Sequence, residues 1–532
     1  MTALMLESFA AGQWIGPGAD ARAIASAVTG EKVAVAGSTL DFQAMLDHAR
    51  FTGGPNLRAM TFHDRARMLK ALALHLGERK DALYALSLHA GCTKADSWID
   101  IDGGIGTVFA FASKGRRELP DAHVHVDGQV EQLSRNGTFL GQHILTPLQG
   151  AAVHINAFNF PVWGMLEKLA PTLLAGVPAI VKPATATSYV AEACFRMMIE
   201  SGILPEGAVQ FIAGGTGDLL GRLTPQDVVS FTGSAATALM LRSDPHILRN
   251  SIRFIAEQDS LNASVLGPDA GPGTPEFDLF VREVIREMTA KAGQKCTAIR
   301  RILVPKAVEG DVIEALKAKL AKTVIGDPAN EAVRMGPLAS QAQRRDVLEK
   351  AAVIGEEAEC VFGDPEAFSV EGADAEKGAF VPPMLFSCDD PDGAQKLHSV
   401  EAFGPVSTIM PYRDLGHALK LANRGEGSLV ASVFTHDPAV ARQAVLEAGA
   451  FHGRLYFANR DTGKEATGHG SPLPHMVHGG PGRAGGGEEL GGVRGVMHYM
   501  QRTAIQASPD LIAGITNRYV AGASTEEKEP HP

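Results

Sequence analysis

The sequence predicts an α/β fold with two lobes, each built on a parallel sheet, and a separate β arm. Three observations lead to this expectation. Short apolar runs alternate with helical stretches over 150–262, the same alternation returns over 263–477, and a hairpin pattern occupies 129–149. Strands that alternate with crossover helices pair in parallel and bury both faces of their sheet, an architecture typical of nucleotide-binding proteins.

The part of the chain before the first lobe is expected to contain helices and then the arm. Residues 62–90 place apolar side chains at helical spacing with charges between them, which predicts two amphipathic helices. In 129–149, apolar and polar residues alternate around Asn136-Gly137, a dipeptide that favours tight hairpin turns. We therefore expect a two-stranded arm there.

The first alternating series supplies one lobe. Strands are expected in AAVHIN, PAIVK, AVQFIAG, VVSFTG and RFIA, and helices are expected to begin at Val162 and Ser188. The dinucleotide fingerprint G-x-G-x-x-G is absent from the sequence. Gly214-Gly215-Thr216-Gly217 imitates it, and either a phosphate contact or a turn with a helix cap would explain these glycines.

The second series predicts another α/β lobe. Its strands are expected in RILVP, VSTIM, LVASVFT and RLYFA, and its helices over 276–293, 307–322, 414–424 and 437–448. The glycine- and histidine-rich segment 464–493 is too long for an ordinary connection, so we expect a functional loop there. The terminal STEEKEPHP is expected to be disordered.

Charge and composition restrict the class of ligand. The net charge is −11 and there is no long basic run, which argues against nucleic acid and favours small molecules. Residues 1–14 carry Glu7 and lack the basic start of a signal peptide, and no run of about eighteen apolar residues follows. These patterns predict a cytoplasmic protein without a membrane span.

The five cysteines are odd in number and lack a C-x-x-C pair, so neither a disulfide framework nor a metal site is expected. Cys296 follows a predicted helix that ends at a glycine. Lys295 beside it would favour the thiolate, the form that attacks a carbonyl carbon. Local context alone leaves a nucleophile and a structural cysteine equally open, whereas Cys92, Cys194 and Cys388 are expected to be structural.

Five short motifs favour a nucleophile over a structural cysteine at Cys296, because together they resemble the aldehyde dehydrogenase family over roughly residues 10–510. In chain order they are Asn159-Phe160-Pro161, Val181-Lys182-Pro183-Ala184, Phe231-Thr232-Gly233-Ser234, Gly293-Gln294-Lys295-Cys296 and Glu401-Ala402-Phe403-Gly404-Pro405-Val406. The resemblance implies that family's fold and division. The nucleotide-binding domain would comprise 1–128 and 150–262, the catalytic domain 263–477, the oligomerisation arm and C-terminal loop 129–149 and 478–510, and a tail 511–532.

The resemblance also gives chemical roles to three residues. Cys296 would attack an aldehyde as a thiolate, the Asn159 amide would stabilise the oxyanion, and Glu257 would activate the water that hydrolyses the thioester. Most of the family has Leu-Gly-Gly-Lys after this glutamate, whereas this chain has 258–262 as Gln-Asp-Ser-Leu-Asn. Such a loop is more polar and less flexible, which leaves the pose of the Glu257 carboxylate open.

Lys168 and Glu489 are candidates for a proton relay from Glu257. Glu167 and Glu488, their neighbours in sequence, are alternatives. Surface ion pairing would explain all four residues equally well.

Cofactor binding is implied by the same motifs. Lys182 would contact the adenosine ribose, Glu401 would hold the nicotinamide ribose, and Ser234 would contact the pyrophosphate unless it serves as a plain helix cap. Thr185 occupies a position where NAD-preferring relatives often carry a glutamate, so NADP is favoured, with NAD also possible. The remaining residues that the resemblance assigns to the cofactor are Ala184, Gly214, Gly233 and Phe403.

The C-terminal part resembles a narrower group. Residues 478–492 and 498–503 are similar to semialdehyde dehydrogenases of aerobic bacterial benzoate and phenylacetate degradation, which act on CoA thioesters. The resemblance implies a CoA-linked aldehyde, which a glycine-rich loop with Arg483 would admit, although tight turns at a subunit boundary also explain these glycines. Residues 129–149 and 494–507 resemble the family's arms, which implies a homodimer or a dimer of dimers.

Three other functions compete with this one. In a CoA-acylating dehydrogenase, free CoA would resolve the thioester, and the presence of Glu257 argues against it because a thiol nucleophile needs no general base. A cofactor-independent thiol esterase would use the same Cys296 and Glu257. A catalytically silent structural relative would use neither.

Overall fold

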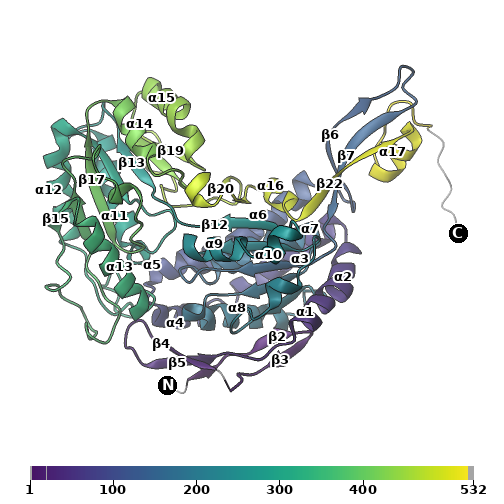
Figure 1. Ribbon diagram of the computed structural model, residues 1–532, viewed down its shortest axis with the longest axis horizontal. Helices are drawn as coiled ribbons and strands as arrows, with labels where there is room; N and C mark the ends of the chain where they lie inside the picture. The colour runs from purple at the N-terminus through teal and green to yellow at the C-terminus, as the bar shows by residue number, and fades with distance from the viewer. Residues whose placement is uncertain (1–2, 20, 525–532) are drawn as a thin grey trace.

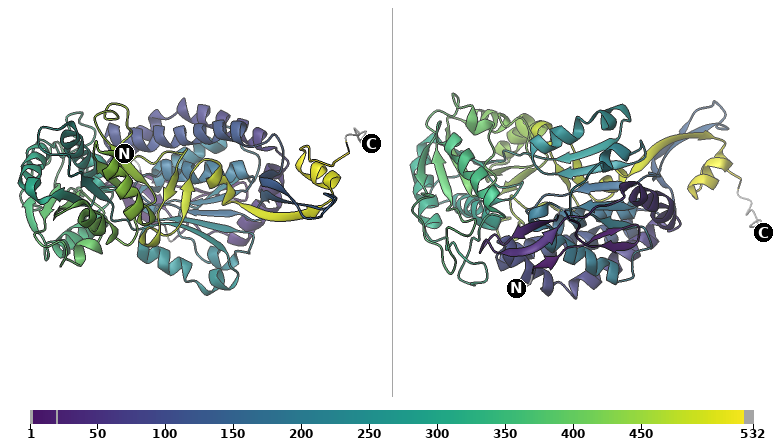
Figure 2. Two further views of the ribbon diagram at one scale, coloured as in Figure 1. Left: turned by 90° about the horizontal axis from the view of Figure 1, so that it is seen from above. Right: turned by 60° about the horizontal axis from the view of Figure 1, so that its bottom comes forward.

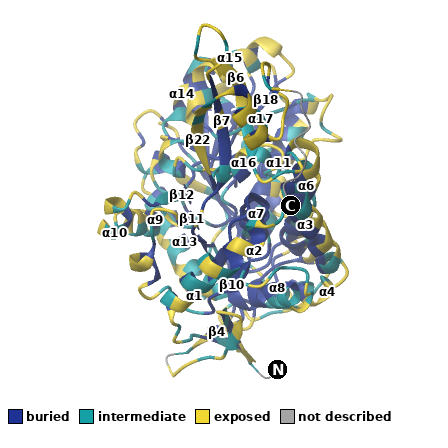
Figure 3. Ribbon diagram, turned by 90° about the vertical axis from the view of Figure 1, so that its right-hand side faces the viewer, coloured by how far each residue is buried: buried dark blue, intermediate teal, exposed yellow. Residues whose placement is uncertain are grey.

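The computed structural model describes residues 3–19 and 21–524. They form two α/β lobes side by side, and a long β arm projects from one of them (Figures 1 and 2). The strands at the centre of each lobe are buried, and the exposed residues gather on the outer helices and loops (Figure 3). No helix of the described residues is long and apolar enough to cross a membrane.

The first lobe is built on a seven-stranded sheet in the order β12-β11-β8-β9-β10-β2-β3. The five strands from β12 to β10 are parallel and coincide with the apolar runs predicted from the sequence. Two short N-terminal strands extend the sheet in the antiparallel sense. The strands are β2 (Ser8–Ala10), β3 (Gln13–Ile15), β8 (Ala152–Ile155), β9 (Ala179–Lys182), β10 (Val209–Phe211), β11 (Val228–Thr232) and β12 (Arg253–Glu257).

Helices cover both faces of this sheet. The two amphipathic helices predicted over 62–90 are present, and the helices expected after Val162 and at Ser188 begin at Trp163 and Ser188. The helices are α1 (Phe42–His48), α2 (Gly54–Arg58), α3 (Phe62–Gly77), α4 (Asp81–Ser87), α5 (Lys94–Ser97), α6 (Gly103–Glu118), α7 (Trp163–Ala175), α8 (Ser188–Glu200), α9 (Ala235–Arg242) and α10 (Pro245–Arg249). A small sheet of β1 (Leu4–Met5), β5 (Lys32–Ala36) and β4 (Arg22–Ala25) lies beside them.

The second lobe has its own seven-stranded sheet, in the order β15-β16-β17-β14-β13-β18-β19, parallel except for β15. Its strands are β13 (Ala263–Leu266), β14 (Arg301–Pro305), β15 (Glu359–Phe362), β16 (Met384–Ser387), β17 (Val406–Tyr412), β18 (Ala431–Phe434) and β19 (Leu455–Ala458). Its helices are α11 (Pro275–Thr289), α12 (Glu309–Leu320), α13 (Gln341–Ile354), α14 (Leu415–Asn423) and α15 (Pro438–Ala448). The expectation of two lobes with parallel sheets is therefore confirmed, with antiparallel strands added at the sheet edges.

The arm is a three-stranded antiparallel sheet of β6 (His125–Gln132), β7 (Leu140–Pro147) and β22 (Met500–Ala507), in the order β22-β7-β6. The hairpin turn contains Asn136-Gly137 as predicted, and Gly137 has a φ of 71°. The segment expected to be a tail, 511–532, contains most of α17 (Pro509–Thr516), whose Ile512 packs on Leu140 of the arm. The end of STEEKEPHP, 525–532, lies outside the described residues.

The glycine- and histidine-rich segment forms a short hairpin of β20 (Val477–Gly479) and β21 (Glu488–Leu490), followed by α16 (Val493–Met497). Figure 1 shows this segment running between the two lobes toward the arm. The hairpin is therefore placed where residues of both lobes can meet.

Candidate active site

A pocket lies where the two lobes meet. The order of the first sheet reverses between β8 and β11, and in such sheets ligands bind beyond the carboxyl ends of the strands at this reversal. The pocket is lined by Ile99, Ala157, Asn159, Phe160, Trp163, Gly164, Glu167, Thr232, Glu257, Lys295, Cys296, Thr297, Gly470, Pro472 and His478.

A tight turn delivers Cys296 to this pocket. The helix predicted over 276–293 ends earlier, at Thr289, because Lys291 and Ala292 adopt left-handed backbone angles (φ 54° and 50°). At Gly293 (φ 66°), a Cβ would lie 2.3 Å from the Gly404 carbonyl oxygen, so only glycine fits this close approach.

The side chains of Arg300 and Asn262 hold this turn by donating hydrogen bonds to its carbonyls. The Arg300 guanidinium donates to the carbonyls of Gly404 (2.6 Å), Gly293 (2.9 Å) and Lys295 (3.2 Å). The Asn262 side-chain amide donates to the carbonyls of Cys296 (2.8 Å) and Ala298 (2.9 Å). Asn262 belongs to the polar stretch that replaces the family's glycines, and this stretch braces the cysteine.

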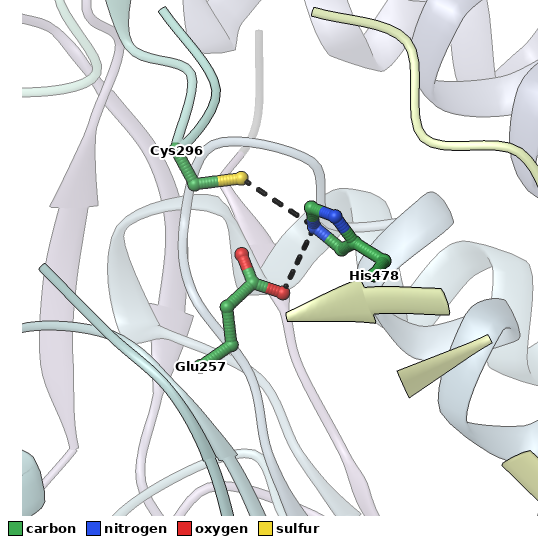
Figure 4. A group of neighbouring side chains, drawn as sticks. All are labelled: Glu257, Cys296 and His478. Carbon is green, nitrogen blue, oxygen red and sulfur yellow. Dashed lines mark hydrogen bonds and ion pairs between the residues drawn. The ribbon is translucent and has the colours of Figure 1, made fainter. Parts of the chain in front are cut away.

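The cysteine thiol lies beside an imidazole and a carboxylate (Figure 4). Cys296 Sγ is 4.0 Å from His478 Nε2, and Glu257 Oε2 is 3.2 Å from the same nitrogen. Burial raises the pKa of the Cys296 thiol well above its usual range, and the Glu257 carboxylate raises it further. The expectation that Lys295 supplies a positive charge to the thiol is wrong, because its ammonium pairs with Glu287 Oε1 at 2.7 Å.

Glu257 is the last residue of β12 and is 2% exposed. Burial by itself would raise the pKa of this carboxyl, but contact with His478 and the nearby charge of Lys168 outweigh burial and lower it. Glu257 is therefore an anion in the resting pocket.

Asn159 follows β8 and is 6% exposed. Its Nδ2 donates to the Gln294 carbonyl oxygen at 3.0 Å, which ties it to the turn that carries Cys296. A primary amide has two N–H groups, so one remains for a second acceptor in the pocket.

Lys168 and Glu489 form a buried ion pair behind Glu257. The Lys168 ammonium is 2.7 Å from Glu489 Oε1 and 2.6 Å from Thr232 Oγ1. Carboxylate oxygens of Glu167, Glu257 and Glu489 lie within 4.8 Å of one another. The alternative of surface ion pairing is wrong for Lys168 and Glu489, which are 2% and 8% exposed.

The two neighbouring glutamates differ. Glu167 is buried and accepts a hydrogen bond from the Trp163 indole at 2.8 Å, and burial raises its pKa to about 8. Glu488 is exposed, and its carboxylate lies 4.0 Å from His498 Nε2. Of the two, Glu167 lies in the pocket and Glu488 does not.

Most residues that are expected to bind the cofactor lie beyond the carboxyl ends of the strands of the first sheet. Lys182 ends β9, Ala184 and the exposed Thr185 follow it, and Gly214 lies just beyond β10. Past β11, Ser234 caps α9 by accepting a hydrogen bond from the Thr237 backbone N–H at 3.3 Å. The helix-cap role of Ser234 is therefore compatible with the predicted pyrophosphate contact, because a serine that caps a helix lies at the helix N-terminus.

Two of these residues have a specific packing. At Gly233, a Cβ would lie 2.6 Å from the Phe231 ring, so this glycine is required by the fold of its own turn. Phe403 stacks edge-on against Phe158, with ring centroids 5.8 Å apart.

Glu401 lies beside a buried cation. Its Oε2 accepts from the Ser260 backbone N–H at 3.4 Å, and its Oε1 forms an ion pair with Arg300 Nε at 3.5 Å without a hydrogen bond. Burial raises the pKa of Glu401 to about 8, opposed by Arg300. A carboxylate oxygen can accept more than one hydrogen bond, so Oε1 beside Arg300 still fits a ribose hydroxyl of a nicotinamide cofactor.

The Arg483 guanidinium already has partners within the protein. It pairs with Asp259 at 2.8 Å and donates to the carbonyls of His398 and Ser399. It ties the loop after Glu257 to the segment before Glu401, and it is not free to meet an anionic substrate in this arrangement.

Sequence reasoning missed His478, Asn262 and Arg300 as site residues. The glycine- and histidine-rich composition of 464–493 marked a functional loop, which was the available signal for His478. Asn262 and Arg300 carry no motif, and their importance comes from carbonyls that only the folded turn exposes.

Comparison with known proteins agrees with this geometry. The profile of the aldehyde dehydrogenase family matches residues 18–505, and the chain belongs to this family. It is therefore a member of a class of NAD(P)-dependent dehydrogenases that act on aldehydes.

Among its relatives, the chain is 45% identical over 480 residues to 3,4-dehydroadipyl-CoA semialdehyde dehydrogenase of Aromatoleum evansii, covering 90% of this chain and 93% of the relative. It is 49% identical over 199 residues to Protein MaoC of Klebsiella aerogenes, covering 37% of this chain and 58% of that protein.

Solved structures show the same fold. A lactaldehyde dehydrogenase superposes with a TM-score of 0.82 at 22% identity, covering 95% of this chain and all of that one. Betaine aldehyde dehydrogenase of Staphylococcus aureus in complex with NAD+ gives 0.81 at 22% identity, covering 98% of this chain and 97% of that one.

Proposed function

We propose that this protein oxidises a CoA-linked semialdehyde to the carboxylic acid with NADP+, through a thioester on Cys296 that Glu257-activated water hydrolyses. The observation that carries the proposal is the convergence of Cys296, Glu257 and Asn159 in one pocket. The A. evansii relative, matched over most of both chains, supports 3,4-dehydroadipyl-CoA semialdehyde as the substrate.

The chain's own residues account for the acyl chemistry. The Cys296 thiolate attacks the aldehyde carbon, and the free N–H of the Asn159 amide stabilises the oxyanion that forms. A bound nicotinamide cofactor supplies the hydride acceptor. Glu257, an anion in the pocket, then takes a proton from water as the water attacks the thioester, and the acid leaves. Lys168 and Glu489 lie behind Glu257 and carry that proton onward.

The cofactor preference rests on the residues around Lys182. Thr185 presents a hydroxyl where a glutamate would repel a 2'-phosphate, and Lys182 supplies a positive charge beside it. The Glu401 oxygen beside Arg300 would accept from a ribose hydroxyl in NAD and NADP alike. Lys182, Ala184, Thr185, Gly214, Gly233, Ser234, Glu401 and Phe403 would together hold NADP.

Oligomerisation is part of the proposal. The arm and α17 expose large apolar side chains that a monomer would leave in water, which favours a homodimer or a dimer of dimers. They are Val130, Leu133, Phe139, Leu511 and Ile515, with Tyr519 just after α17.

The test is a substrate and cofactor panel. The purified protein is given 3,4-dehydroadipyl-CoA semialdehyde or a free semialdehyde, with NADP or NAD, and reduced nicotinamide is followed by absorbance. The proposal expects the fastest reaction with the CoA ester and NADP, and a product whose mass is that of the acid. A new CoA thioester at the aldehyde carbon, formed only with added CoA, would instead establish the acylating activity. The absence of cofactor reduction would favour an esterase or a silent relative.

A further inference from the structure

His478 has a place in the pocket that the reaction described above leaves without a role. The ring is 4% exposed, and its Nε2 faces both Cys296 Sγ at 4.0 Å and Glu257 Oε2 at 3.2 Å. Figure 4 shows the imidazole of β20 directed at both side chains. Because both contacts use one nitrogen, a single proton on Nε2 can be shared with either neighbour but not with both at once.

The cysteine needs a proton acceptor. Burial and the adjacent Glu257 carboxylate both disfavour the thiolate form of Cys296. The ammonium of Lys295, the residue next to it in the chain, is held by two contacts to Glu287, at 2.7 and 2.8 Å. An imidazole in contact with the sulfur is a group that can accept its proton and compensate the new charge.

We propose that His478 is a further catalytic residue, which takes the proton of the Cys296 thiol before attack. The S–H bond breaks and an Nε2–H bond forms. The sulfur electron pair then bonds to the aldehyde carbon, and the carbonyl π pair moves to oxygen. Until attack, the imidazolium lies between the thiolate and the Glu257 carboxylate, and its Nε2–H can donate to Glu257 Oε2. The inference rests on the proposed function, since it serves attack on an aldehyde.

The charges around the ring support this role. Burial and Arg454 disfavour the imidazolium, whereas contact with Glu257 from β12 and the charge of Glu167 from α7 outweigh them and raise the pKa of His478. Glu489, opposite His478 on β21, is itself neutralised by its buried ammonium partner. The surrounding anions thus stabilise the imidazolium that forms when the ring takes the thiol proton.

Alkylation of Cys296 tests the proposal without any substrate. Iodoacetamide reacts with the thiolate, so its rate against pH reports the population of the anion. The measurement uses the full chain with Cys360→Ser, because Cys360 is an exposed cysteine that would also react, and the modified peptide is identified by mass. His478→Gln keeps a side-chain amide near the position of Nε2 but cannot take a proton. His475→Gln, at an exposed histidine three residues earlier, is the matched control.

We expect His478→Gln to slow alkylation at neutral pH by about ten- to a hundredfold and to move the midpoint of the profile to higher pH, since one pKa unit is tenfold in thiolate population. His475→Gln should leave the profile unchanged. A His478→Gln profile that superimposes on the parent would overturn the proposal. Should that variant lose its circular dichroism spectrum, His478→Asn gives the same decision. If the parent oxidises no aldehyde, the proposed function fails, while the alkylation profile still decides whether His478 takes the thiol proton.

Discussion

His478 on β20 and Glu489 on β21 are direct partners across their two-stranded sheet. Directly opposed side chains share one face of a sheet, and on this face His478 lines the pocket while Glu489 lies near Glu257. His478 contacts Glu257 and Cys296, while Glu489 pairs with Lys168 behind Glu257. One hairpin from a segment without regular sequence pattern therefore supplies two titratable groups to the catalytic carboxylate.

Lys168→Met should destabilise the protein, because it leaves the buried Glu489 carboxylate without its cation. Removing one partner of a buried ion pair costs about 3 to 5 kcal/mol, which urea unfolding would measure. Lys350→Met, at the exposed pair with Asp346, is the control and should cost under about 1 kcal/mol. Equal losses in the two variants would mean that the Lys168 pair contributes no more than a surface contact.

Thr185→Glu should reduce or reverse the preference for NADP. The new carboxylate would accept from the 2'-hydroxyl of NAD and repel the 2'-phosphate of NADP. Because Thr185 is exposed, solvent screens the repulsion, and we expect about a tenfold change in the ratio of kcat/KM values rather than more. An unchanged ratio would show that Thr185 does not lie beside the adenosine ribose.

Leu511→Asp should weaken assembly, because it places a charge in the apolar surface of α17. Leu511 is 62% exposed in one chain. Light scattering of the unmodified protein at micromolar concentration should give a dimer or tetramer, and the variant should shift toward the monomer. Leu446→Asp on α15, 75% exposed in the other lobe, should not. A parent protein that scatters as a monomer contradicts the assignment of the arm.

Cys296→Ser should abolish aldehyde oxidation while NADP still binds, because a hydroxyl is far less acidic and nucleophilic than a thiol. The residues expected to hold the cofactor lie on other elements, so fluorescence titration with NADPH should give a similar dissociation constant. Cys388→Ser, at a buried cysteine outside the pocket, is the control and should retain turnover. Substantial turnover by Cys296→Ser would remove this residue as the nucleophile.

The parallel strands of the first lobe, and β14, β17, β18 and β19 of the second, could be predicted because each is an apolar run bounded by turns, whereas β13 was missed. β2 and β3 could not, since each has three residues, and they join the sheet only because β2 pairs with the distant β10 and β3 pairs with β2. The end of α11 was missed for a similar reason. The left-handed turn after Thr289 is imposed by the contact of Gly293 with Gly404, more than a hundred residues away in sequence.

The residues of the site also divide into those that could be predicted from the sequence and those that could not. Cys296 and Asn159 lie in recognisable motifs and the family resemblance pointed to Glu257, so roles could be predicted for all three. The charge of Lys295 was misassigned because adjacency in sequence does not indicate direction, and its ammonium meets Glu287 instead. His478 reaches Cys296 across 182 positions from a segment without helical or strand periodicity, and no local pattern predicts that contact.

The central claim is that Glu257 activates the water that hydrolyses a Cys296 thioester, and the intact mass of Glu257→Gln after reaction tests it most directly. The variant is mixed with NADP+ and the CoA-linked semialdehyde, quenched in acid, and digested to locate the modification. We predict one equivalent of reduced cofactor per site, then a stall, with the acyl group on the peptide that contains Cys296. Continued turnover at the parent rate, with no acyl group on that peptide, would contradict the claim.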